Sequence, residues 1–101
     1  GQQIDGPTEK IMNNRDLQMK YEAFGWKVLH VDGNDMAELQ LCLANAKKML
    51  GNDIPIMILM KTEMGAGVDF MMYSHKWHGV APNDQQLQDA LAQLEETLGD
   101  Y

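Results

Sequence analysis

The sequence has 101 residues, 45% of them apolar, and a formal net charge of −7 from 15 acidic and 8 basic side chains. That length suits one domain, and the apolar content argues against a disordered chain. The acidic excess excludes the basic surface that nucleic acids and anionic membranes need, so we expect neither as a partner.

The cysteine and hydropathy patterns bear on the cellular compartment. Cys42 is the only cysteine, which rules out an internal disulfide and suits a reducing compartment. No apolar run approaches the ~20 residues of a membrane-spanning helix, and the N-terminus has no basic-then-apolar signal pattern. We therefore expect a cytoplasmic chain that does not enter a membrane.

The N-terminal part predicts a strand end and a loop, followed by one amphipathic helix. A Gly-Pro pair marks the loop. The helix is predicted to begin at Asn13 or Asn14, either of which can cap it. It ends near Phe24, with Leu17, Tyr21 and Phe24 spaced for one face.

A strand and a second helix follow. Residues 26–31 alternate and are rich in aromatic and β-branched side chains, which predicts a strand. A turn at 32–34 leads to a helix over about 35–50, for which Asn34 is the expected cap. The predicted apolar stripe of this helix consists of Met36, Leu39, Leu43, Ala46 and Leu50.

The C-terminal part predicts a second strand, a long loop and a last helix. Residues 54–60 form a near-continuous apolar run, typical of a strand covered on both faces of a parallel sheet. Residues 61–82 carry three glycines and a proline, and a helix is predicted from Asn83, which has capping-box spacing with Gln86. The order helix–strand–helix–strand–long loop–helix indicates an α/β fold with a right-handed crossover. Two strands do not make a stable open sheet, so the chain pairs with others or is part of a larger domain.

Ligands of open α/β sheets bind beyond the carboxyl ends of the strands, where we expect residues 1–7, the turn 32–34 and the loop 61–82. The loop 61–82 is longer than a connection needs, which indicates a function. Its Gly65-Ala66-Gly67 run lets backbone amides approach a phosphate, or is simply a turn. His75 and His78, with Asp69, are candidates for a metal site. Alternatively, a histidine in this loop donates to a phosphate or acts as acid or base, or has no role at the surface.

Three other residues have chemically active side chains. Two of them are given structural interpretations, and the third has two possible interpretations. His30 lies in a predicted strand and is interpreted as a core or strand-face histidine. Cys42 has apolar neighbours on a helix and is interpreted as a small hydrophobe rather than a nucleophile. Lys61 either attracts anions or extends its ammonium group into solvent from the strand end.

An ordered set of motifs resembles the transketolase family over essentially the whole chain. The closest pattern is that of bacterial split transketolases, whose N-terminal subunit ends soon after the last helix. The motifs are Ile4-Asp5-Gly6-Pro7-Thr8, Lys20-Tyr21-Glu22-Ala23-Phe24-Gly25-Trp26, Val31-Asp32-Gly33-Asn34-Asp35, Lys61-Thr62, Gly65-x-Gly67, and Trp77-His78-Gly79-Val80-Ala81-Pro82.

The resemblance implies that residues 1–101 are the C-terminal part of a parallel-sheet thiamine-diphosphate-binding domain. The reaction implied is transfer of a two-carbon ketol group from a ketose phosphate to an aldose phosphate. By the same resemblance, the Gln2 carbonyl is a ligand of Mg²⁺ or Ca²⁺ at the cofactor, and Ile4 packs against the cofactor ring. His78 reaches both the diphosphate and the donor sugar.

The sequence departs from the family pattern at several anchors. The Gly-Asp-Gly motif and the asparagine that hold the diphosphate and its metal are not in these 101 residues, and Met64 stands where many relatives have a lysine. We therefore expect no turnover from the chain alone. The expected partners are the remaining segments or subunits of a transketolase, sugar phosphates and further copies in a homo-oligomer. The alternatives are a non-catalytic assembly module of the same fold and a deoxyxylulose-phosphate synthase.

Overall fold

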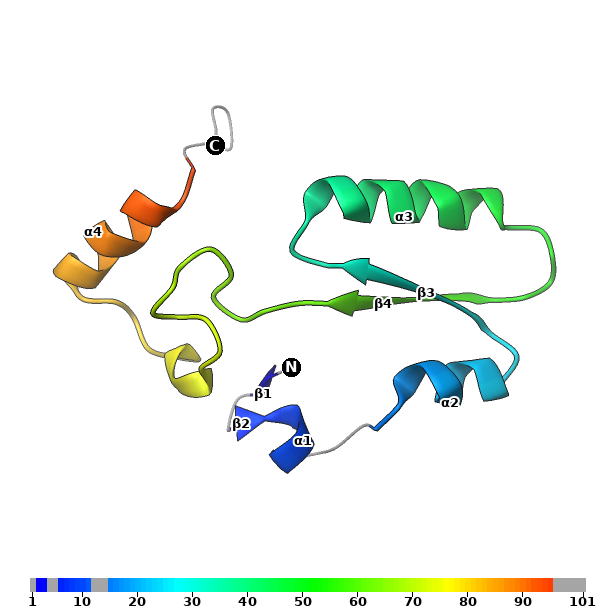
Figure 1. The fold of residues 1–101 in the computed structure, drawn as a ribbon, viewed down its shortest axis with the longest axis horizontal. Coiled ribbons are helices and arrows are strands. Elements are labelled where there is room, and N and C mark those ends of the chain that lie inside the picture. The colour runs from blue at the N-terminus through cyan, green and yellow to red at the C-terminus, as the bar shows by residue number, and fades with distance from the viewer. Residues whose placement is uncertain (1, 4–5, 12–14, 96–101) are drawn as a thin grey trace.

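The computed structural model describes residues 2–3, 6–11 and 15–95 of the chain (Figure 1). A small N-terminal hairpin and a short helix precede a strand–helix–strand unit, which a long loop joins to a last helix. The elements are β1 (Gln2–Gln3), β2 (Gly6–Pro7), α1 (Thr8–Ile11), α2 (Leu17–Ala23), β3 (Lys27–Asp32), α3 (Met36–Lys48), β4 (Ile56–Lys61), the 3₁₀ helix η1 (His75–Trp77) and α4 (Asp84–Gln93). None of the helices in these ranges is both long and apolar enough to cross a membrane.

The unit β3–α3–β4 confirms the α/β expectation. The two strands are parallel, with Lys27 opposite Ile56 at one end and Asp32 opposite Lys61 at the other. Pro55 lies just outside β4, where its missing N–H costs no ladder bond, and its carbonyl accepts from Lys27 N at 2.9 Å. Figure 1 shows α3 on one face of this pair and α2 on the other.

The helix caps correct two of the expected starts. Helix α2 begins at Leu17 because the Asp16 carboxylate accepts from Met19 N at 3.0 Å. The predicted cap at Asn13 or Asn14 is therefore wrong for this helix, and those two residues lie outside the described ranges. Helix α3 is capped by Asp35, which accepts from Glu38 N at 3.0 Å, and not by Asn34. Aspartate is as good a cap as asparagine, so residue type does not distinguish candidates that lie one to three positions apart.

The last helix begins as expected. Asn83 Oδ1 accepts from Gln86 N at 2.8 Å, and Gln86 Oε1 accepts from Asn83 N at 2.9 Å. This reciprocal pair satisfies two backbone donors at the helix start, so the capping-box prediction is confirmed.

The buried faces of α2 and α3 differ from the predicted stripes. Along α3 and its C-cap, the partly covered side chains are Leu39, Cys42, Ala46 and Met49. Met36 and Leu43 are instead 67% and 53% exposed, and Leu50 falls beyond the helix end. Phe24, predicted on the α2 face, is the C-cap residue and is 82% exposed. The covered side of α3 shares only Leu39 and Ala46 with the predicted stripe, because packing against β3 selects the face that is covered.

The described part of the chain buries little apolar surface. Its buried hydrophobic side chains are Val28, Val31, Val68 and Ala90, which are still 5% to 9% exposed. The radius of gyration is 17.3 Å, whereas a compact domain of this length has about 13 Å. Strand β4 is apolar on both faces, from Ile56 to Met60, as expected of an interior strand. These surfaces need further polypeptide to cover them.

We predict that the chain alone self-associates, because exposed apolar faces and open sheet edges favour contact between copies. Sedimentation at low micromolar concentration should show a dimer or a larger species. Leu43→Glu should weaken this association, whereas Gln40→Glu, at an exposed polar position of the same helix, should leave it unchanged. A folded monomer of the unmodified chain would contradict the prediction.

Candidate functional site

The loop between β4 and α4 lies at the carboxyl ends of the two parallel strands. In Figure 1 both this loop and the N-terminal hairpin lie on the side toward which β3 and β4 point. The turn after β3 is bonded directly to the start of the loop: Gly33 N donates to the Lys61 carbonyl at 2.8 Å, and Glu63 N donates to Asn34 Oδ1 at 2.7 Å. The sequence prediction that these segments share one edge is therefore confirmed.

The contact at this edge has no room for a side chain on the turn. A Cβ atom on Gly33 would lie 2.6 Å from Thr62 Cγ2 and 2.9 Å from Met60 Cβ. Asn34, expected as a helix cap, instead uses its amide oxygen to hold the backbone of Glu63. The turn after β3 thereby sets the direction in which the loop leaves β4.

A second bond from Glu63 reaches ten residues along the loop. Glu63 Oε1 accepts from Tyr73 N at 2.9 Å. Tyr73 has φ +58°, a left-handed conformation that costs a non-glycine residue on the order of 1 kcal/mol. The carboxylate thus holds a strained turn five positions before His78.

Close packing leaves no room for a side chain at either glycine of the Gly65-Ala66-Gly67 run. Gly65 has φ +69°, and a Cβ there would lie 2.6 Å from Met71 Cβ. Gly67 has φ +92°, and a Cβ there would lie 2.9 Å from Leu94 Cδ2. Val68 N donates to the Gly65 carbonyl at 3.1 Å, so the run forms a turn. This geometry favours the turn interpretation over a phosphate cradle.

The turn that presents His78 is fixed by the tryptophan before it. Trp77 Nε1 donates to the Phe70 carbonyl at 2.9 Å, and the two rings lie 5.4 Å apart between centroids. His78 N closes the 3₁₀ turn by donating to the His75 carbonyl at 3.1 Å. Gly79 follows with φ +82°, which turns the chain away.

The imidazole of His78 is exposed and makes no hydrogen bond to any side chain or backbone group of residues 2–3, 6–11 and 15–95. The arrangement therefore holds the backbone of the histidine while leaving both ring nitrogens available. Such a group can donate to an anionic oxygen or exchange a proton.

The metal interpretation of His75, His78 and Asp69 gains no support. Nowhere in the described ranges do three His, Cys, Asp or Glu side chains gather as a metal site requires. Asp69 is engaged elsewhere, because its carboxylate accepts from Gln93 Nε2 at 3.0 Å.

The resemblance assigns two further residues to the site, Gln2 and Ile4. Gln2 belongs to β1 and pairs with Pro7 of β2. Proline has no N–H, so Pro7 cannot occupy the Gln2 carbonyl with a ladder bond. Ile4 lies outside the described residues.

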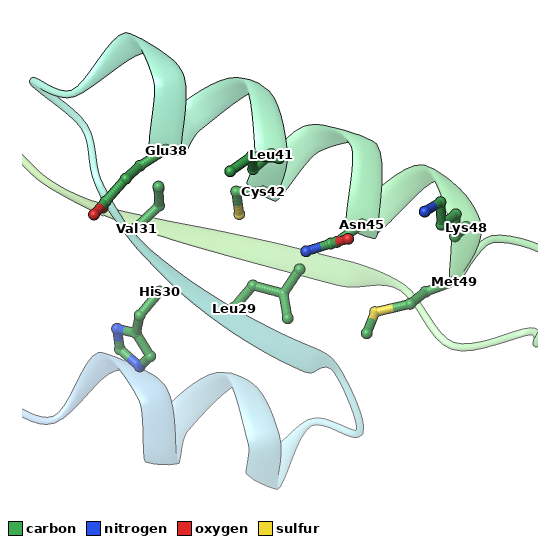
Figure 2. A pocket seen from close by; sticks show the side chains of 9 residues that line it. All are labelled: Leu29, His30, Val31, Glu38, Leu41, Cys42, Asn45, Lys48 and Met49. Atoms are coloured by element: carbon green, nitrogen blue, oxygen red, sulfur yellow. The ribbon is translucent and has the colours of Figure 1, made fainter.

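The residues given structural interpretations lie away from the His78 turn. His30 is on the face of β3, and its Nε2 lies 2.8 Å from Gln18 Oε1 of α2, which confirms a strand-face role. Cys42 is half-buried and lines a hollow of about 490 Å³ between α3 and β3 (Figure 2). In Figure 2 the side chains of Leu29, Cys42 and Met49 face this hollow, with Asn45 and Lys48 along its rim.

Lys61 lies at the end of β4 and lines a smaller hollow at the carboxyl edge. That hollow measures about 270 Å³ and is shared with Asp32, Asn34, Glu63 and Tyr73. The Lys61 side chain is exposed at this edge.

Open α/β sheets bind ligands beyond the carboxyl ends of their strands, and this chain has a structured loop there. Comparison with known proteins identifies its family. Residues 2–99 match the family described as transketolase, thiamine diphosphate binding domain. The chain therefore belongs to that family.

Individual relatives agree with this assignment. The chain is 29% identical over 96 residues to an apulose-4-phosphate transketolase subunit of Phocaeicola vulgatus, covering 95% of the chain and 34% of the relative. It is 34% identical over 93 residues to a 6-deoxy-6-sulfo-D-fructose transketolase subunit SqwG of Clostridium sp., covering 92% and 33%. It is 42% identical over 78 residues to transketolase 1 of Saccharomyces cerevisiae, covering 75% and 11%. The chain thus spans about a third of the first two relatives.

We predict that Trp77→Phe loosens the His78 turn while preserving the ring contact with Phe70. The substitution removes the indole N–H that binds the Phe70 carbonyl, a bond worth about 0.5–1.5 kcal/mol. Hydrogen exchange of the amides in 70–78 should accelerate, and that of β3 and β4 should not. Equal acceleration in the strands would show that the indole supports the whole fold rather than this turn.

Proposed function

We propose that the chain is the C-terminal part of the diphosphate-binding domain of a transketolase. In the assembled enzyme it takes part in the transfer of a two-carbon ketol group from a ketose phosphate to an aldose phosphate. The observation that carries the proposal is the exposed imidazole of His78 in the loop at the carboxyl edge, which makes no hydrogen bond within the part of the chain that the structure describes. Family membership over residues 2–99 supplies the chemical context.

The residues of the site fit a contribution to a thiamine diphosphate site. An imidazole N–H that donates to a diphosphate oxygen makes a charge-assisted bond of about 1.5–3 kcal/mol. The Gln2 carbonyl, which Pro7 cannot engage, fits a ligand of Mg²⁺ or Ca²⁺, both of which bind oxygen. Ile4 would supply an apolar contact to the cofactor ring.

When bound, thiamine diphosphate supplies the carbanion chemistry of ketol transfer, and the protein supplies position and electrostatics. The part given to His78 is to orient the diphosphate through one ring N–H. The imidazole is also placed to exchange a proton with a hydroxyl of the donor sugar, which assists most in the transition state. The fixed backbone of the His78 turn serves this role, because acid–base groups work only when held in position.

The complete site needs polypeptide beyond these residues. The Gly-Asp-Gly motif and the metal-binding asparagine of the family do not occur in this sequence. Two of the relatives are named as subunits, which supports partners that carry the remaining segments. The proposed assembly is a homo-oligomer of the completed enzyme in the cytoplasm, acting on sugar phosphates.

A second candidate is an assembly module of the same fold that makes contacts without binding cofactor. The large exposed apolar surface and the absence of the diphosphate anchors from the sequence favour it for the chain taken alone. The two candidates differ in whether substitution of His78 alters the activity of the assembled protein.

We expect the chain alone to bind thiamine diphosphate weakly, because it offers the metal one carbonyl and no identified carboxylate. Mg²⁺ is normally held by one or two carboxylates together with phosphates. Calorimetric titration of the chain with thiamine diphosphate and Mg²⁺ measures this directly. A dissociation constant near micromolar would contradict the expectation.

In the assembled enzyme, His78→Ala should weaken cofactor affinity on the order of ten-fold, because one charge-assisted bond is lost. It should also lower kcat at saturating cofactor by about 10²–10⁴-fold if the imidazole assists proton transfer. Cofactor titration and steady-state kinetics separate the two effects.

His75→Ala is the matched control, since His75 is in the same turn and contributes to it through its carbonyl. If both substitutions have equal effects, disorder of the turn explains them and the role given to His78 is wrong. If neither alters activity, the assembly module is the better description.

A further inference from the structure

The loop that carries His78 is attached to α4 by a reciprocal pair of side-chain hydrogen bonds. Asp69 N donates to Gln93 Oε1 at 2.8 Å, and Gln93 Nε2 donates to Asp69 Oδ1 at 3.0 Å. The two residues are 24 positions apart, so the bonds join the middle of the loop to the last residue of α4. No residue of α4 has a part in the proposed chemistry.

The packing around this pair shows a built contact between the same two segments. Val68 and Ala90, which adjoin the loop and helix ends of the contact, are 5% and 7% exposed in a chain with little other buried surface. Gly67 lies so close to Leu94 that a Cβ would approach Leu94 Cδ2 to 2.9 Å. The hydrogen-bonded pair therefore lies next to a close approach of the loop at Gly67 to Leu94 at the end of α4.

A short mechanical path leads from this contact to the imidazole. Phe70 follows Asp69 in the chain, and its carbonyl accepts from Trp77 Nε1 at 2.9 Å. Trp77 in turn precedes His78. One hydrogen bond and two peptide links thus connect Asp69 to His78.

We infer that Gln93 is a positioning residue, which acts through Asp69 to fix the turn that presents His78. The inference rests on the proposed function of His78 and deepens it. In this role, α4 supports the loop at the carboxyl edge of the sheet. Because the His78 ring makes no bond of its own within the described ranges, its place depends on such backbone anchors.

The test exchanges the carboxylate of Asp69 and the amide of Gln93 between the two positions, in the assembled, full-length protein. Gln93→Glu replaces the donating amide with a carboxylate that faces the Asp69 carboxylate, and the repulsion opens the pair. Asp69→Asn alone is tolerated, since the asparagine oxygen still accepts from Gln93. Combining Asp69→Asn with Gln93→Glu restores both bonds. The backbone N–H at position 69 still donates to the side-chain oxygen at position 93, and only the side-chain bond is reversed, with the new asparagine amide donating to the new carboxylate. Gln88→Glu, the same substitution at an exposed position of α4, controls for added charge.

Two readouts are expected to change together. Gln93→Glu should accelerate hydrogen exchange of the amides in 68–78, among which Met71, Met72 and His78 donate backbone bonds. It should lower kcat for ketol transfer by about ten- to a hundred-fold, as a misplacement near 1 Å does. The exchanged pair should recover both values, and Gln88→Glu should alter neither.

A double-mutant cycle separates positioning from general destabilisation. In a His78→Ala background, Gln93→Glu should have no further effect on kcat, because an absent imidazole cannot be misplaced. Failure of the exchanged pair to recover, or an undiminished effect without His78, would overturn the inference. If the unmodified enzyme transfers no ketol group, the proposed function fails, and the hydrogen-exchange arm still decides whether Gln93 fixes the His78 turn.

Discussion

The close approach of the turn after β3 to the end of β4 organises the ligand edge of this molecule. Gly33 lies against Met60 and Thr62 with no space for a Cβ, and its N–H bonds to the Lys61 carbonyl. Asn34 can then reach the backbone of Glu63, and Glu63 in turn reaches that of Tyr73. The strand pair, the turn and the loop thus form one connected unit. A side chain at position 33 would separate them.

A similar use of backbone contacts explains how His78 is held. Its turn is fixed through the indole of Trp77 and the backbone of His75, so the imidazole remains available to a ligand. His30 shows the opposite arrangement, because its Nε2 is engaged by Gln18 in a contact between α2 and β3. His30 and His78 therefore differ in whether their ring nitrogens can bind a ligand. The ring of His30 is held by a hydrogen bond, whereas only the backbone of His78 is held.

The described residues have the elements of an α/β domain without its full core. Strand β4 is apolar on both faces, and α3 has one apolar side toward β3 and another that is exposed. The hydrophobic effect favours covering such surfaces, which together exceed what two strands and their helices can bury. The relatives, of which the chain spans about a third, have the additional polypeptide that this burial requires.

The sequence by itself determined the kinds and order of the main elements. It also determined the parallel strand pair, the capping box at Asn83, and the edge at which Asp32–Asn34 and the loop after Lys61 meet. These follow from local periodicity, turn chemistry and the geometry of parallel sheets. It did not determine the residues that cap α2 and α3, because aspartate and asparagine one to three positions apart are nearly equivalent caps. It also did not determine which side of α3 is covered, because that depends on packing against β3. Only the tertiary structure decided that Asn34 holds Glu63, that Gly67 accommodates Leu94, and that Gln93 binds Asp69. These contacts join residues far apart in the chain, so the local sequence pattern does not predict them.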